Sequence, residues 1–232
     1  MKKITIDNLI EFRRKKSDNT KFTVLHKSQK EKVKKPGESG GHYWVCCISA
    51  ANNVFKTDDK GFLNLKIEEL RKWIEETENE GSKKRWQQSI EIISNLEDYD
   101  FTILKPSTEM KILKKPSDKS LLKINDLLLE AEPHHVFSYT NNDFDEIGAV
   151  WFVAKKDGFQ KSELAMFSDI IFRYLTANFA DKFKINPKLC IAVDLFNAQE
   201  VNYEQLLNGD VNYLLDTVID DVKAALTKLN YC

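Results

Sequence analysis

The apolar run GAVWFVAK at residues 148–155 decides the fold of this chain. It is rich in residues that favour strands, and it is far too short to cross a membrane as a helix. A strand that is apolar on both faces belongs in the middle of a sheet whose two sides are covered. The sequence therefore predicts a mixed α/β fold, with residues 147–155 as the central strand of a mixed sheet covered by helices.

A hairpin is predicted shortly before this strand. Asn125 and Asp126 both tolerate positive φ, so they suit a two-residue turn between strands at 121–124 and 127–132. Pro133 interrupts the second strand, which we expect to resume as far as residue 139. The chain then turns into the central strand.

Two helices and one more strand are predicted after the central strand. Residues 161–180 place apolar side chains on one helical face, and residues 211–229 do the same near the end of the chain. Between them, residues 189–196 form a second buried strand. The expected order is hairpin, central strand, long helix, buried strand and final helix.

The first 95 residues are predicted to be largely helical. Helical spacing indicates a helix at 5–16 and two helices between residues 65 and 95. Gly81 and Ser82 suit the end of one of these two helices and the start of the next. The pair forms either a helical hairpin or one long projecting helix.

Three shorter segments complete the prediction. Residues 42–55 favour a buried helix, although a strand at 43–48 also fits their aromatic residues. Residues 99–104 are expected to form a short strand. Residues 106–116, which begin and end with proline, are expected to be a surface connection.

The length and composition point to one domain. At 232 residues with 42% hydrophobic residues, the chain is long enough to bury a real core. We predict a single domain in which residues 1–95 form a helical lobe and residues 96–232 form the sheet with its C-terminal helix. Lys and Arg number 35 against 36 Asp and Glu, so any nucleic-acid-binding surface must be local.

The sequence also indicates where the protein resides. It has no run of about 18 apolar residues that would span a bilayer. Its first seven residues lack the apolar core of a signal peptide. None of the four cysteines forms a C-x-x-C pair, so neither a zinc ribbon nor a thioredoxin-like motif is predicted. We expect a soluble cytoplasmic protein with no membrane partner, and the sequence predicts no particular oligomeric state.

One block of the chain is strongly basic. Residues 13–35 contain ten lysines and arginines against Asp18 and Glu31. Such a block either follows a phosphate backbone or forms a solvated arm with few apolar residues. The predicted nucleic-acid-binding residues are Lys30, Lys32, Lys34 and Lys35.

The order of hairpin, third strand, long helix and fourth strand, preceded by helices, resembles the core of the PD-(D/E)xK nuclease superfamily over residues 85–196. In that superfamily an Asp on the second strand and an acidic-x-Lys motif on the third strand hold magnesium, and the lysine positions or activates the attacking water. Hard divalent cations prefer carboxylate oxygens, and the metal neutralises charge during phosphodiester cleavage. The resemblance implies a restriction-endonuclease-like sheet.

The chain departs from the motif at both positions. On the third strand the sequence Val153-Ala154-Lys155 keeps the lysine and replaces the carboxylate with valine. On the second strand Pro133-His134 stands in place of Pro-Asp, and an imidazole is a poor magnesium ligand. A rearranged site would have to recruit other side chains. The candidate catalytic residues are Lys155, Glu132, His134, His135, Asp145 and Glu146.

Two functions from different classes follow. The first is a non-catalytic binding or scaffold protein with a degenerate nuclease-like core, which needs no cofactor and binds a protein partner or, through its basic arm, nucleic acid. The second is a metal-dependent DNA or RNA nuclease with a rearranged site and magnesium as its cofactor. An unrelated α/β protein with the same strand order is a third alternative. We favour the first because the motif carboxylates are missing.

Overall fold

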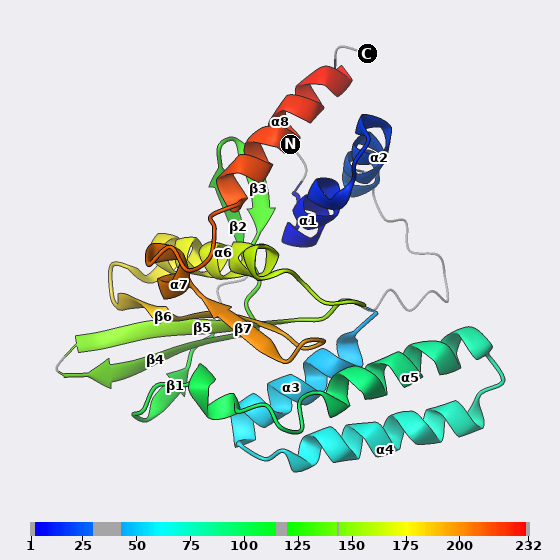
Figure 1. The fold of residues 1–232 in the computed structure, drawn as a ribbon. Helices are drawn as coiled ribbons and strands as arrows, with labels where there is room; N and C mark the ends of the chain where they lie inside the picture. Colours follow the sequence, from blue (N-terminus) through cyan, green and yellow to red (C-terminus); the bar gives the residue numbers. More distant parts are fainter. Residues whose placement is uncertain (1–2, 30–42, 115–119, 143, 231–232) are drawn as a thin grey trace.

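The centre of the molecule is a five-stranded mixed sheet (Figure 1). The computed structural model describes residues 3–29, 43–114, 120–142 and 144–230. The predicted mixed α/β class and central strand are confirmed, because β5 (Phe144–Val153) is the third strand in the order β1-β4-β5-β6-β7. It pairs antiparallel with β4 (His135–Asn141) and parallel with β6 (Lys184–Asp194).

Both faces of β5 are buried, as its composition predicts. Ala149 belongs to the hydrophobic cluster on one face of the sheet, whereas Val150 and Phe152 belong to the cluster on the other. The β5–β6 register shifts between Ile147 and Ala149. A side chain on the intervening Gly148 would place its Cβ 2.7 Å from Cβ of Leu189, so glycine permits the close approach of the two strands.

The two outer strands of this sheet are short. They are β1 (Met110–Ile112) and β7 (Gln199–Asn202). The prediction of a surface connection at 106–116 is wrong in part, because this segment contains β1, which pairs with β4. The predicted strand at 99–104 is also wrong. A 3₁₀ turn, η1 (Phe101–Leu104), occurs there, and the Asp100 carboxylate holds it by accepting a hydrogen bond from the Thr102 N–H at 2.9 Å.

The predicted hairpin forms, but outside the main sheet. Strands β2 (Leu121–Ile124) and β3 (Leu127–Glu130) make a separate two-stranded sheet. Its turn residues Asn125 and Asp126 take φ of 45° and 65°, as predicted. The predicted second strand is interrupted around Pro133. Its two parts are β3 and β4, which belong to different sheets.

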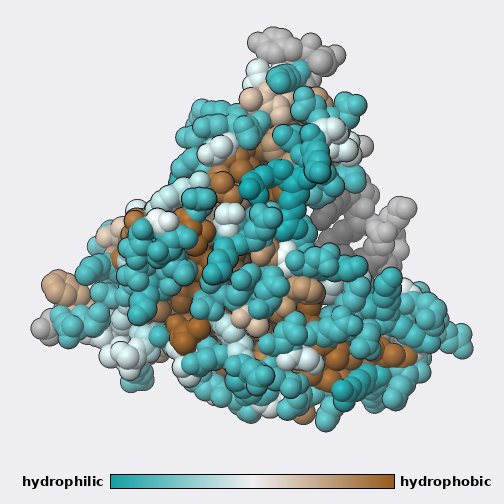
Figure 2. All heavy atoms as spheres, in the orientation of Figure 1, coloured by the Kyte–Doolittle hydropathy of each residue, from teal (hydrophilic) through white to brown (hydrophobic). Residues whose placement is uncertain are grey.

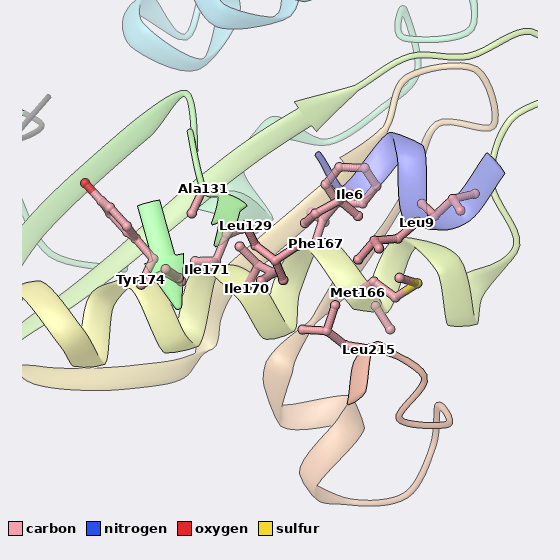
Figure 3. Packing of buried hydrophobic residues seen from close by; sticks show 14 of the residues in the cluster. Ile6, Leu9, Leu129, Ala131, Met166, Phe167, Ile170, Ile171, Tyr174 and Leu215 are labelled. Atoms are coloured by element: carbon pink, nitrogen blue, oxygen red, sulfur yellow. The ribbon is translucent and has the colours of Figure 1, made fainter. Parts of the chain in front are cut away.

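On one face of the main sheet the helix Lys161–Phe179 packs directly on the strands, and three further helices and the small hairpin complete the same hydrophobic cluster. The helices are α1 (Ile6–Arg14), α2 (Asp18–Gln29), α6 (Lys161–Phe179) and α8 (Leu215–Asn230). Figure 3 shows Phe167 and Ile170 of α6 packed among Ile6 of α1 and Leu129 of β3. Helix α7 (Tyr203–Leu207) follows β7 on the same face. In the described part of the basic block, residues 13–14 end α1 and residues 18–29 form α2, and Val24 and Leu25 are buried rather than solvated.

Three helices cover the opposite face (Figure 1). They are α3 (Val45–Thr57), α4 (Gly61–Glu76) and α5 (Glu80–Ser94). Of the alternatives, the helix is right for the segment predicted at 42–55, where α3 begins at Val45, and the helical hairpin is right for residues 65–95. Asn79 caps α5 by accepting from the Ser82 N–H at 2.9 Å, so Ser82 is not the cap. The helices of the first 95 residues are thus divided between the two faces of the sheet.

The surface of the molecule is mostly polar. Figure 2 shows hydrophilic residues over most of the visible face, with hydrophobic residues visible between the elements and over the α4–α5 hairpin. Within the described part of the chain, no helix combines the length and the apolar character needed to cross a bilayer.

Candidate functional site

The candidate catalytic residues are divided between the two ends of β5. Asp145 and Glu146 lie at its start, whereas Lys155 follows its last residue by two positions. At about 3.3 Å per strand residue, roughly 30 Å of chain separates Glu146 from Lys155. These side chains do not form one site.

At the start of β5, Glu146 belongs to a closed hydrogen-bond network. Its buried carboxylate accepts hydrogen bonds from the Tyr139 hydroxyl at 2.5 Å and from Nδ2 of Asn186 at 2.8 Å. Burial raises the pKa of Glu146, but these two hydrogen bonds, a third from Asn141 and the charge of Lys184 together outweigh it and hold the pKa below its usual value. The neighbouring Asp145 is exposed and accepts from Oγ1 of Thr140 at 3.0 Å. The polar side chains at this end of the strand therefore form hydrogen bonds with one another.

At the other end of β5, strand pairing stops on one side. The last β4–β5 pair is His135 with Val150, so beyond that point no described strand lies on this side of β5, whereas β6 stays paired on the other side as far as Val153. A cavity of about 240 Å³ opens there, and we call it the strand-end cavity. Its aromatic wall residues are Trp44, Trp151, Phe152 and Phe167. Its acidic residues are Asp7, Glu130 and Glu132.

The structure places Glu132 and His134 together in the strand-end cavity. The Phe152 N–H donates to Nδ1 of His134 at 3.2 Å, which leaves the proton of the neutral imidazole on Nε2. The adjacent His135 does not line the cavity. It is buried, and its ring stacks on Phe55 with centroids 4.7 Å apart.

The donor set of the strand-end cavity does not fit the magnesium site that the resemblance implies. Val153 is buried at the acidic position of the motif, and Glu130 forms an ion pair with Lys3. Nδ1 of His134 accepts a backbone hydrogen bond. The described residues contain no group of three or more His, Cys, Asp or Glu side chains arranged to hold a metal ion. We therefore assign no metal-dependent step to them.

Lys155 belongs to a different surface from the strand-end cavity. Its ammonium lies 6.0 Å from the centre of the Phe159 ring, and the Arg14 guanidinium lies 5.8 Å from the same centre. Arg14 also donates to Oε1 of Glu163 at 2.8 Å and to the Gly158 carbonyl at 3.1 Å. These contacts fix the C-terminal end of α1 against the loop that follows β5.

This contact gathers lysines and arginines that are far apart in the sequence. Residues 11–16 and 155–163 contain seven Lys and Arg against Glu11, Asp157 and Glu163. Glu163 is itself buried beneath Arg14. We call the remaining cations the basic surface: Arg13, Lys15, Lys16, Lys155, Lys156 and Lys161.

Asp194, at the end of β6, holds the loop that carries part of the basic surface. Its buried carboxylate accepts from the Phe159 N–H at 2.8 Å and from Nδ2 of Asn197 at 2.7 Å. Within this loop Gly158 takes φ of 65°, and a Cβ there would lie 2.0 Å from the same Nδ2. Asp194 therefore serves to hold the two loops at this end of the sheet.

The sequence did not indicate most of the strand-end cavity. Asp7 comes from α1, Trp44 directly precedes α3 and Trp151 comes from β5, and no spacing in the sequence connects them. Only the alternation along β5 could have pointed to Trp151. The four lysines predicted to bind nucleic acid, Lys30, Lys32, Lys34 and Lys35, lie outside the described residues.

The strand-end cavity and the basic surface thus lie at the same end of β5, and they differ in charge and in shape. Comparisons of the chain with protein-family models, with curated proteins and with solved structures find no match.

Proposed function

We propose that this chain is a non-catalytic binding protein that contacts the phosphate backbone of nucleic acid through the basic surface. The observation that carries the proposal is the contact of Arg14 with Gly158 and Glu163. It joins the basic end of α1 to the loop with Lys155 and Lys156. The proposal extends the sequence-based prediction from the arm to cations on both sides of this contact.

The charge distribution explains why this surface suits a polyanion. The whole chain has a formal charge of -1, so its net charge does not attract a polyanion. At the basic surface, however, Arg14 and Lys155 meet over the Phe159 ring, while Arg14 and Arg13 pair with the buried Glu163. Lysines and arginines so placed displace counterions from phosphates, which supplies most of the sequence-independent affinity.

The strand order of the main sheet supports a degenerate nuclease-like core. Strands β1, β4 and β5 are successively antiparallel, α6 follows, and β6 returns parallel to β5. This is the order that suggested the PD-(D/E)xK resemblance, with β1 as the first strand in place of residues 121–124. The valine at position 153 supports a core without the motif acid.

The test is binding of a fluorescent 20-nucleotide single strand, with RNA and DNA tested separately, measured by anisotropy at several salt concentrations. Changing Lys15, Lys16, Lys155 and Lys156 to Gln should weaken binding at least tenfold. On a single strand it should also lower the slope of log K against log salt by about 3, because each phosphate contact contributes about 0.7.

The control changes four exposed lysines elsewhere, Lys56, Lys72, Lys84 and Lys111, and alters the net charge equally. Its affinity should stay within about threefold of the unchanged protein, because surface charges more than about 10 Å away are screened. A third variant with Lys30, Lys32, Lys34 and Lys35 changed to Ala tests the arm separately. Equal losses in the first variant and its control would refute the basic surface as the binding site.

A nuclease with a rearranged site is the competing proposal. It is favoured by the presence of Glu132 and His134 in one cavity at the end of the strand that leads to Lys155. It predicts cleavage of DNA or RNA with magnesium or manganese that Lys155→Ala abolishes. Our proposal predicts no cleavage with either ion, and nucleic acid binding that is independent of both.

A further inference from the structure

We propose that the strand-end cavity receives one unstacked base of a single strand whose phosphates contact the basic surface. The inference rests on the proposed nucleic-acid contact and names its substrate class, a single strand rather than a duplex. Two observations carry it. The cavity adjoins the basic surface, and two partly exposed tryptophans lie in the cavity wall.

The cavity and the basic surface are joined by a row of packed aromatic rings. Trp151, which lines the cavity, packs edge to face on Phe167, with ring centres 5.3 Å apart. Phe167 packs in the same way on Phe159 at 5.6 Å, and Arg14 and Lys155 lie over the Phe159 ring. In the sequence, Lys155 directly follows a residue of the cavity wall. A single strand whose phosphates meet Lys155 can therefore place a neighbouring base at the cavity.

The shape of the cavity suits a flat ring. On this side of β5 the sheet has a gap beyond Val150, because β4 has ended. Trp44 belongs to the hydrophobic layer of α3 and Trp151 to the layer of α6, so one indole borders the gap from each layer. Both indoles are partly exposed, whereas Phe152 and Phe167 are buried behind them. Exposed aromatic rings stack on bases of any sequence, so the gap is suited to an unpaired base.

The size and the polar lining of the cavity fit a base without its phosphate. The volume of about 240 Å³ is smaller than the roughly 300–1,000 Å³ of pockets that enclose drug-sized ligands, so the sugar and phosphate stay outside. The exposed Glu132 carboxylate is among the lining groups. A carboxylate accepts hydrogen bonds, and guanine offers two adjacent N–H donors, whereas a phosphate diester offers none. We therefore expect guanine to be a preferred base.

The experiment measures binding of the full chain to two 20-nucleotide DNA strands by anisotropy at one salt concentration. One strand is abasic throughout, and the other is identical except for a single guanine at its centre. Both strands carry the same phosphates, so a difference in affinity reports the base. The guanine should strengthen binding at least fivefold, because one stacked base contributes a factor of about 5 to 150 in affinity.

Three variants locate the base. Trp151→Leu should remove most of the gain from guanine and leave binding of the abasic strand within about twofold of the unchanged protein. Glu132→Gln should reduce the gain severalfold, and because this side chain is exposed, the variant tests the cavity without disturbing the core. The control is Trp86→Leu, which removes a partly exposed tryptophan of α5 outside the cavity and should keep the full gain. Thermal unfolding of each variant confirms that it is folded.

The outcomes separate this inference from the proposed function. Equal binding of the two strands, with binding of both weakened in the four-lysine variant of the basic surface, would overturn the base site and leave the proposed function standing. A gain from guanine that Trp86→Leu removes as fully as Trp151→Leu would also overturn the base site. If neither strand binds, and the strand with all its bases does not bind either, the proposed function fails and this inference fails with it.

Discussion

The two ends of β5 differ in how far their polar groups are satisfied. At the start, Glu146, Tyr139 and Asn186 bond to one another, and strands lie on both sides. At the end, pairing with β4 stops at Val150, and a cavity and a basic surface take its place. One strand thus has one end whose polar groups bond to one another and another end that borders a cavity and a basic surface, as expected where a regular element gives way to loops.

The largest expected effect compares a buried phenylalanine near the end of β5 with an exposed one at its start. Phe152 is fully buried and packs against Phe55 and Phe101, so Phe152→Ala should lower the free energy of unfolding by about 3–5 kcal/mol. Phe144, on the same strand, is 64% exposed, and Phe144→Ala should change it by less than about 1 kcal/mol. Urea denaturation measures both, and equal losses would contradict the burial assigned to β5.

A smaller effect, which depends on pH, concerns the end of β5. Burial raises the pKa of Glu163, but the hydrogen bonds from Arg14 and the Gln160 N–H and the charges of Arg14 and Arg13 together outweigh it and hold the pKa below the usual 4.5. The ionised carboxylate therefore stabilises the fold above about pH 4.5, and this stabilisation is lost as the pH falls through the lowered pKa. Glu163→Gln should cost about 2 kcal/mol at pH 7, because Arg14 is partly exposed and the full cost of a broken buried pair is larger.

The measurement is the difference in unfolding free energy between the unchanged protein and Glu163→Gln from pH 7 to pH 3. That difference should shrink toward zero below pH 4. Lys16→Gln, which removes an exposed charge next to the same contact, should show a small difference that varies little with pH. A Glu163→Gln difference that grows on acidification would show that the sign assigned to this carboxylate is wrong.

The smallest effect compares one carboxylate from each end of β5. Glu146→Gln removes a charged acceptor from a buried network and should cost about 1–2 kcal/mol. Glu132→Gln changes an exposed carboxylate outside any hydrogen bond in the described ranges, and it should stay within about 0.5 kcal/mol of the unchanged protein. Thermal or urea unfolding of the two variants at pH 7 measures these losses of stability. A larger loss in Glu132→Gln than in Glu146→Gln would contradict the difference between the two ends.

The sequence predicted the parts of the fold that depend on local pattern. The run around Val150 is apolar on both faces, and Asn125 and Asp126 tolerate positive φ, so the central strand and the hairpin turn were both found. The predictions failed where tertiary contacts decide. Strand β1 is three residues long, too short for any period to show, and it is defined only by its pairing with β4.

The candidate sites were harder to predict for the same reason. Glu132 and His134 were singled out through the resemblance and do lie together, but Asp145 and Glu146 were included only because they are near in sequence. An extended strand carries such residues away from its far end at about 3.3 Å per residue. The contact of Arg14 with Gly158, which creates the basic surface, joins residues 144 positions apart. Such a contact has no signature in a single sequence.

The most direct test of the central claim is the salt dependence of nucleic acid binding. We predict that the chain binds a 20-nucleotide single strand with an affinity that falls steeply as salt rises. The variant with Lys15, Lys16, Lys155 and Lys156 changed to Gln should lose most of that dependence, whereas the variant changed at Lys56, Lys72, Lys84 and Lys111 should keep it. Binding that does not respond to salt, or that is lost equally in both variants, would contradict the account.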